Sequence, residues 1–171
     1  DAYGSTYLSD LDATVLTSSG TITRDAVSNG SLLRVNNSVY AKGFSSNGAS
    51  QINIKLDKAY TTFQADIGLD PTTASGSAVT FQIVGDGVVL YTSPILTSAN
   101  TAIPVSINVQ NVSLLALKVF VSGTASPSTV IADWGAARII KSPTSAVGFS
   151  ATSESTGSLE WQVSLNGSVI S

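Results

Sequence analysis

The chain has 171 residues, of which 43% are hydrophobic and only 11% are charged, and its net charge is −3. An ordinary soluble domain carries about 25% charged residues, so Ser, Thr, Asn and Gly must cover most of this surface. The absence of His and Cys excludes thiol nucleophiles, imidazole bases and Cys/His zinc sites, and eight Lys and Arg against eleven Asp and Glu make nucleic acid an unexpected partner.

The sequence between residues 51 and 140 has the two-residue period of β-strands. Ile52, Ile54 and Leu56 alternate with polar residues, which indicates one buried and one wet face. Gly85-Asp86-Gly87 separates two apolar segments and predicts a tight hairpin turn, because Asp-Gly supplies the positive φ values that such turns need. We expect an all-β domain, an antiparallel β-sandwich of the jelly-roll type with little helix. The predicted strands cover residues 51–56, 61–68, 78–84, 88–91, 105–109, 114–121 and 136–140.

The composition changes at Lys141-Ser142-Pro143-Thr144-Ser145, where Pro and Ser interrupt the strand pattern. We therefore predict a β-sandwich domain over residues 1–140, followed over residues 141–171 by a linker and a C-terminal β extension with strands at 147–153 and 159–165. The last strand carries an apolar stripe that two strands alone cannot bury, so it must dock on the sandwich or on a neighbouring molecule. The stripe consists of Leu159, Trp161, Val163 and Leu165.

Six short motifs follow one another along the first 140 residues. They are Tyr7-Leu8-Ser9-Asp10-Leu11, Val39-Tyr40-Ala41-Lys42-Gly43-Phe44, Phe63-Gln64-Ala65-Asp66-Ile67-Gly68-Leu69-Asp70, Val79-Thr80-Phe81-Gln82-Ile83-Val84-Gly85-Asp86-Gly87, Leu90-Tyr91-Thr92-Ser93 and Ala132-Asp133-Trp134-Gly135-Ala136-Ala137-Arg138-Ile139. In this order they resemble the NPCBM family of carbohydrate-binding domains, over about residues 5–140. The resemblance implies a β-sandwich that is appended to glycoside hydrolases, binds sugars, of galactose type in some members, and has no catalytic activity of its own.

Sugar binding generally needs an aromatic face for the C–H groups of the ring and a few fixed polar groups for its hydroxyls. Near the family motifs, side chains of these kinds are Trp134, Tyr40, Asn47, Asp133 and Arg138. Asn47 stands where the family commonly carries a His, and Val130-Ile131 stands where it commonly reads Asp-His. Trp134 has a second interpretation as a core residue beside a turn-forming Asp133, since aromatic residues dominate sandwich cores.

The carboxylates allow two further interpretations. Asp66, Asp70 and Asp86 could supply oxygen ligands to a structural Ca²⁺, but a turn already explains Asp86 and a loop start explains Asp70. We expect no cofactor. Four carboxylates could in principle supply the general acid and the general base of a glycosidase. Nothing in the sequence fixes the distances between them, and we expect the protein not to be an enzyme. These four are Asp57, Asp66, Asp133 and Glu160.

Two functions are compatible with these observations. The low charge, the apolar segments near both ends and the changed polar positions favour an extracellular structural subunit that assembles with copies of itself into a surface fibre or layer by terminal-strand addition. The alternative is a carbohydrate-binding module for galactose-type or related glycans. The assembly residues would be the stripe at Leu159, Trp161, Val163 and Leu165 together with Tyr3 and Tyr7.

The sequence also bears on location. It starts at Asp1 without Met and has no stretch of the ~18–20 apolar residues that a membrane span needs. We therefore expect a mature extracellular or cell-surface protein whose signal peptide has been removed. Four Asn-x-Ser sequons are candidate glycan acceptors, and they begin at Asn29, Asn36, Asn111 and Asn166.

Overall fold

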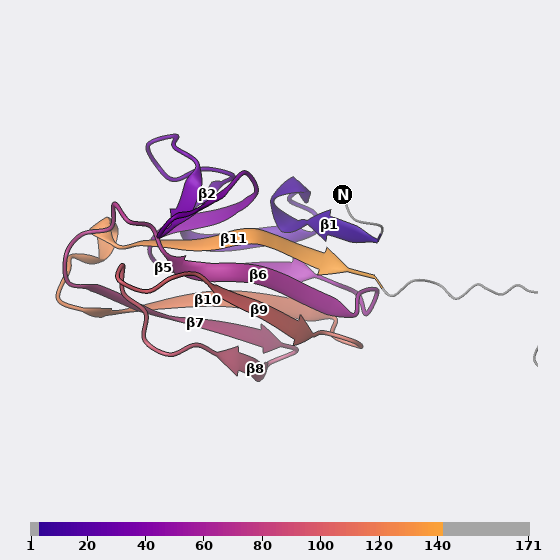
Figure 1. Ribbon diagram of the computed structural model, residues 1–171. Helices are drawn as coiled ribbons and strands as arrows, with labels where there is room; N and C mark the ends of the chain where they lie inside the picture. Colours follow the sequence, from indigo (N-terminus) through magenta and orange to yellow (C-terminus); the bar gives the residue numbers. More distant parts are fainter. Residues whose placement is uncertain (1–3, 142–171) are drawn as a thin grey trace, which may run out of the picture. The chain divides into compact units, whose positions relative to one another are not determined.

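The computed structural model describes residues 4–141, and these form an antiparallel β-structure with two single-turn 3₁₀ helices (Figure 1). The expected all-β sandwich is confirmed. In chain order the elements are β1 (Ser5–Tyr7), η1 (Leu8–Asp10), β2 (Leu16–Arg24), β3 (Leu33–Val35), β4 (Ser38–Tyr40), β5 (Gly43–Lys55), β6 (Thr62–Leu69), β7 (Ser77–Gly85), β8 (Val88–Thr92), β9 (Ile103–Asn108), β10 (Leu114–Gly123), η2 (Pro127–Thr129) and β11 (Ile131–Ile140).

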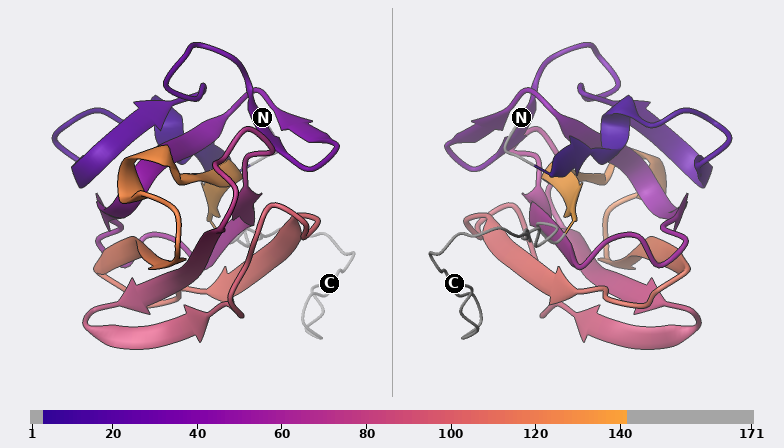
Figure 2. Two further views of the ribbon diagram at one scale, coloured as in Figure 1. Left: turned by 90° about the vertical axis from the view of Figure 1, so that its left-hand side faces the viewer. Right: turned by 90° about the vertical axis from the view of Figure 1, so that its right-hand side faces the viewer.

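The long strand β5 connects the two layers of the sandwich. Residues 43–47 of β5 pair with β11, residues 50–55 pair with β10, and β2 runs along the opposite edge of both parts. Gly48 lies between the two parts with φ of 84°, which a residue without a Cβ adopts at little cost. One layer therefore continues from β5 through β11 and β6 to β9, and the other through β10 and β7 to β8. Figure 2, which looks along the strands, shows how the sheet curls back on itself.

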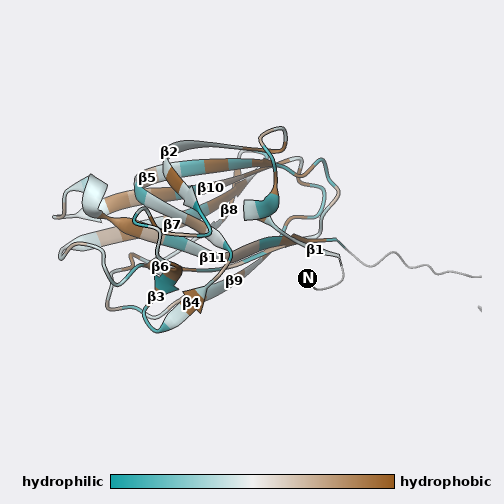
Figure 3. Ribbon diagram, turned by 90° about the horizontal axis from the view of Figure 1, so that it is seen from above, coloured by the Kyte–Doolittle hydropathy of each residue, from teal (hydrophilic) through white to brown (hydrophobic). Residues whose placement is uncertain are grey.

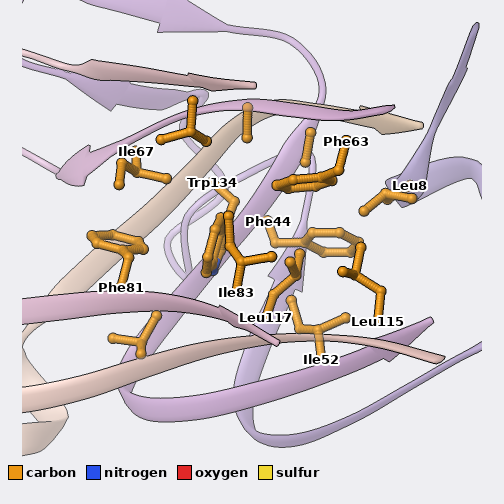
Figure 4. Close-up of a cluster of buried hydrophobic side chains, with 14 of the residues drawn as sticks. Leu8, Phe44, Ile52, Phe63, Ile67, Phe81, Ile83, Leu115, Leu117 and Trp134 are labelled. Carbon is orange, nitrogen blue, oxygen red and sulfur yellow. The ribbon is translucent and has the colours of Figure 1, made fainter. Parts of the chain in front are cut away.

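The space between the layers is filled by one hydrophobic core. Trp134 on β11 is 0% exposed, and its ring packs edge-on against Phe81 on β7 at 4.9 Å and against Phe63 on β6 at 6.2 Å between centroids. Figure 4 shows this cluster. Alternate strand residues supply the core, as the banding in Figure 3 shows. The predicted inward set of Ile52, Ile54 and Leu56 is confirmed, because none is more than 1% exposed.

A small hairpin, β3–β4, covers one end of the outer face of the layer β5-β11-β6. Leu33 and Val35 on β3 are 0% exposed, and Gly68 on β6 lies beneath Val35. A Cβ at position 68 would come within 2.3 Å of Cγ1 of Val35, so only Gly allows this approach. Arg34 and Val39 are paired across the hairpin and are exposed, so they face away from the sheet.

The predicted turn at residues 85–87 is confirmed, since Asp86 and Gly87 have φ of 49° and 84° between β7 and β8. The carboxylate of Asp86 also accepts hydrogen bonds from the backbone N–H groups of Ser113 and Leu114. Within the described residues no helix is long and apolar enough to cross a membrane.

Several predictions concern segments that the structure does not describe. Tyr3 and the whole of residues 142–171 lie outside the described residues. The linker and the C-terminal β extension over 141–171, with the apolar stripe at Leu159, Trp161, Val163 and Leu165, therefore stay predictions. Tyr7 is described, and its strand β1 pairs with β11 of the same chain, with Tyr7 opposite Arg138. Residues 5–7 thus complete their own sheet rather than that of a neighbour.

Candidate functional site

A cleft of about 430 Å³ opens where two loops meet the β3–β4 hairpin. We call it the loop cleft. The loop between β2 and β3, the outward face of the hairpin and the loop after β6 form its walls. Leu32 and Val39 give it an apolar surface, with 54% and 57% of their areas exposed. The lining residues are Val27, Asn29, Ser31, Leu32, Arg34, Val39, Asp70 and Thr72.

The loops that line the cleft are held in place by their own hydrogen bonds. In the first loop the N–H of Val27 donates to the carbonyl of Ser31 at 2.8 Å, and the side chain of Asn29 accepts from the N–H of Ser31 at 2.9 Å. In the second loop Oδ1 of Asp70 accepts from the N–H of Thr72 at 2.8 Å. Asp70 is only 3% exposed, so the cleft contains a fixed carboxylate with most of its surface covered.

Arg34 supplies the cation of the loop cleft. Its side chain is exposed and comes from the outward face of β3. The backbone N–H of Arg34 instead contacts β11 beneath the hairpin, where it donates to Oδ2 of Asp133 at 3.2 Å. A guanidinium presents several N–H donors in a rigid plane, so Arg34 and Asp70 together offer donors and acceptors of opposite charge in one opening.

Asp133 lies beneath the hairpin. It is 0% exposed and stands in register with Ser45 on β5 and Gly68 on β6. Burial raises the pKa of Asp133 to about 7, and the charge of Asp70 adds to the increase, although Ser45 and the N–H of Arg34 oppose it. Asp133 was predicted to bond a sugar hydroxyl. The hairpin covers it, so it supports the wall of the loop cleft and does not line it.

The predicted aromatic partner Trp134 belongs to the core. Its ring is fully enclosed between Phe63 and Phe81, so it cannot stack on a sugar, and the interpretation as a core residue is the correct one. Asn47 is half-buried on β5, and its Nδ2 donates to the carbonyl of Ser128 at 3.2 Å. Asn47 therefore fastens β5 to the segment before β11 and is not part of the cleft.

Tyr40 and Arg138 lie together on a different surface, the outer face of β11, β6 and β9. The hydroxyl of Tyr40 donates to Oδ2 of Asp66 at 2.9 Å, and Nη2 of Arg138 donates to Oε1 of Gln64 at 2.7 Å. Burial and the bond to the Asp66 carboxylate raise the pKa of Tyr40 to about 12, so Tyr40 remains a hydrogen-bond donor at neutral pH. Of the five predicted glycan-binding residues, the structure brings only these two close to one surface.

The residues proposed for calcium do not converge. Asp66 bonds Tyr40, Asp70 bonds Thr72, and Asp86 bonds the backbone at Ser113 and Leu114. Among residues 4–141 no group of three acidic side chains is placed to hold a metal ion.

Three of the four sequons fall in the described part of the chain. Asn29 is exposed in the loop cleft, and Asn36 and Asn111 have positive φ of 54° and 66° at turns. Asn166 lies outside the described residues. Glycosylation of these sequons stays a prediction.

Sequence reasoning missed most of the loop cleft. Arg34, Leu32 and Val39 come from a segment without long periodic strands, and only the folded hairpin brings them to Asp70. The turn-forming sequence Asn29-Gly30-Ser31, next to Leu32, could have indicated a binding loop. Binding residues are often carried by loops on a rigid scaffold.

The sequence model of the NPCBM/NEW2 domain matches residues 4–140. The chain belongs to this family. The NPCBM domain is also 29% identical over 115 residues to a protein of Renibacterium salmoninarum described as "Putative endo-alpha-N-acetylgalactosaminidase", a match that covers 67% of this chain but only 8% of that protein.

Solved structures of similar fold are CBM51 modules. The CBM51-2 and INT domains of ZmpB from Clostridium perfringens superpose with a TM-score of 0.71 at 25% identity, over 80% of this chain and 31% of that one. The CBM51 of a GH95 protein of Clostridium perfringens, solved in complex with methyl-galactose, gives a TM-score of 0.70 at 23% identity and covers 79% and 99% of the two chains.

These relatives correct the expected function. A carbohydrate-binding family, the CBM51 folds and the glycosidase relative favour carbohydrate binding over a self-assembling fibre subunit. The prediction of assembly with copies of itself was therefore wrong. It gave too much weight to low surface charge, and it assigned to a neighbour a terminal strand, β1, that the chain uses in its own sheet.

Proposed function

We propose that this NPCBM domain is a non-catalytic carbohydrate-binding module that holds a neutral sugar in the loop cleft. Family membership supports the class of ligand. The CBM51 modules of similar fold were solved with methyl-galactose and with GlcNAc, which makes galactose-type and N-acetylated hexoses the first probes. Such glycans are displayed outside cells, so we place the module in an extracellular protein.

The observation that carries the proposal is the composition of the loop cleft. Its volume of about 430 Å³ falls within the roughly 300–1,000 Å³ usual for small-molecule sites. It combines a fixed carboxylate at Asp70, an exposed guanidinium at Arg34 and apolar side chains at Leu32 and Val39. A hexose needs these features, because it presents vicinal hydroxyls at its rim and C–H groups on its face.

In the bound state the carboxylate of Asp70 accepts from sugar hydroxyls while Arg34 donates to neighbouring oxygens. Leu32 and Val39 cover the C–H face of the ring. The charges of Asp70 and Arg34 cancel, which suits a neutral ligand better than a phosphate or a uronic acid.

Among the described residues, none of the carboxylates considered for glycosidase chemistry, Asp57, Asp66 and Asp133, lines the loop cleft. Asp133 is covered by the hairpin, Asp66 lies on the outer face of β6, and neither lines the loop cleft. An acid and base pair must flank one glycosidic bond, so this arrangement supports binding without hydrolysis. Glu160 lies outside the described residues.

Isothermal titration with galactose, N-acetylgalactosamine and GlcNAc tests the proposal. The Arg34→Ala variant keeps the backbone N–H that bonds Asp133, so it removes the cation without disturbing the hairpin. A hydrogen bond from a charged group contributes about 1.5–3 kcal/mol, so at least a tenfold loss of affinity is expected. Lys55→Ala, exposed at the end of β5, is the matched control and should bind as the parent does. Equal binding by all three proteins would refute the assignment.

A further inference from the structure

The outer face of four neighbouring strands presents a row of side chains that the loop cleft does not use. Strand pairing sets Tyr7 on β1 opposite Arg138 on β11, Arg138 opposite Gln64 on β6, and Gln64 opposite Ser106 on β9. Residues paired in this way project from the same side of a sheet. Their neighbours Phe63, Ala65 and Ile139 are buried, so the row faces outward.

A second row lies beside the first. Gly135 on β11 pairs with Asp66 on β6, which pairs with Pro104 on β9. The ring of Tyr40 rests on Gly135, where a Cβ would come within 2.7 Å of the ring carbons. The missing side chain at position 135 thus lets the hairpin residue Tyr40 reach Asp66 across the sheet.

Hydrogen bonds fix the polar groups of these rows. Nη1 of Arg138 donates to the carbonyl of Ala136 at 2.9 Å and Nη2 donates to Gln64 at 2.7 Å. Nε2 of Gln64 donates in turn to Oγ of Ser106 at 3.3 Å. Within the described residues these bonds use two of the five N–H donors of the guanidinium. A fixed cation with donors to spare is a preorganised hydrogen-bonding group.

A hollow of about 220 Å³ lies among these groups, lined by Gln64, Ala65, Asp66, Pro104, Val105, Ser106 and Arg138. It is smaller than the roughly 300–1,000 Å³ of sites for drug-sized ligands, so it has room for one ring. Pro104 is exposed and offers a small apolar surface. The opposite charges of Arg138 and Asp66 stand one row apart, which disfavours an anionic ligand.

We propose that this outer face, centred on Gln64, Asp66 and Arg138, is a second binding site that takes a neutral sugar ring through its hydroxyls. Arg138, Gln64 and Ser106 donate, Asp66 accepts, and Pro104 with Tyr7 contacts the C–H groups. The β3–β4 hairpin separates this face from the loop cleft, since Tyr40 reaches Asp66 from one side of it while Arg34 and Val39 face the other. The domain can therefore hold two sugars of one polysaccharide or of two neighbouring glycans at once.

The test is an amide NMR titration of the full chain with methyl galactoside and, separately, GlcNAc, in the parent and in Arg34→Ala. The variant weakens the loop cleft and leaves the outer face intact. We expect saturable shifts of the Gln64, Asp66 and Ser106 amides in both proteins at millimolar sugar. Gln64→Ala should weaken this binding about fivefold, and Asn108→Ala, exposed on β9 outside the hollow, should not.

The two sites give distinguishable outcomes. If the amides of residues 64, 66 and 106 stay unmoved by both sugars at tens of millimolar while those of the loop cleft shift in the parent, the second site is refuted and the proposed function stands. If only the outer-face amides shift, the loop cleft is refuted and the second site stands. If neither set moves, both are refuted. An unchanged affinity of the outer face in Gln64→Ala also overturns the assignment.

Discussion

Replacement of Asp133 by Asn should make the protein more stable at high pH and should alter the pH dependence of unfolding. Asp133 is fully buried beneath the hairpin, and its pKa is raised from an ordinary 3.8 to about 7, mainly by burial. Below pH 4 the carboxyl is protonated in both the folded and the unfolded states. Between pH 4 and 7 only the unfolded state ionises, so the free energy of unfolding falls as the pH rises, and the loss is complete above the folded pKa.

The size of this effect follows from the shift. About three pKa units at 1.36 kcal/mol each amount to roughly 4 kcal/mol. Asn has the same shape and its Oδ1 can accept from the N–H of Arg34, but it does not ionise. The stability of Asp133→Asn relative to the parent should therefore increase by roughly 4 kcal/mol from pH 4 to pH 8.

Urea unfolding followed by circular dichroism, at steps between pH 4 and pH 8, measures this difference. Asp57→Asn is the control, because Asp57 is exposed at a turn with φ of 50°, a conformation that Asn tolerates. The Asp133→Asn difference is compared with that of the control at each pH. A difference for Asp133→Asn that stays level with pH would mean that the hairpin does not bury Asp133, and the described wall of the loop cleft would then be wrong.

Two further predictions concern the hairpin and the loop cleft. Gly68→Ala should destabilise the protein by about 1–3 kcal/mol, because its Cβ would meet Val35. Adding Val35→Ala should recover part of that loss, and a double-mutant cycle measured by urea unfolding checks the coupling between the two positions. Strictly additive free-energy changes would contradict the packing of β3 on β6. A glycan attached at Asn29, verified by mass spectrometry on protein from a glycosylating host, should abolish sugar binding in the loop cleft, and enzymatic deglycosylation should restore it; equal binding by both forms would place the site elsewhere.

The sequence predicts the layers of the fold well where strands alternate strictly. At positions 51–56 the buried face of the strand can be predicted from the sequence, because every inward-facing residue has a large aliphatic side chain. The first half of β5 gives no such signal. Ser45 and Ser46 are buried there as small polar residues on opposite faces of the sheet, so their burial is set by what packs over each face and not by side-chain hydrophobicity.

Strand β2 was missed because it is exposed, not because it is buried without apolar residues. It pairs only with β5 and most of its residues are exposed, so it forms through backbone hydrogen bonds and needs no apolar pattern. The family resemblance, carried by motifs such as the one around Trp134, predicted the fold correctly, but residue type near those motifs could not tell a surface side chain from a core one such as Trp134. The aromatic ring of Trp134 could stack on a sugar, but the ring is buried because β6 and β7 place Phe63 and Phe81 against it.

The candidate site could be predicted only in part, for a topological reason. Asp70 and Arg34 are far apart in the chain and line one cleft because the β3–β4 hairpin folds over Gly68. The pattern of hydrophobic residues along the chain cannot predict that these two segments come together. Tyr40 and Arg138 were identified from residue type near the motifs, and strand register then placed them on a surface that contains Gln64 and Asp66 as well.

A crystal structure of this NPCBM domain with a bound galactose-type or N-acetylated sugar shows directly whether the loop cleft is the binding site. We expect electron density for one ring in the loop cleft, with its hydroxyls within hydrogen-bonding distance of Asp70 and Arg34 and its C–H face on Leu32 and Val39. A sugar bound elsewhere, with an empty loop cleft that is open to solvent in the lattice, would contradict it.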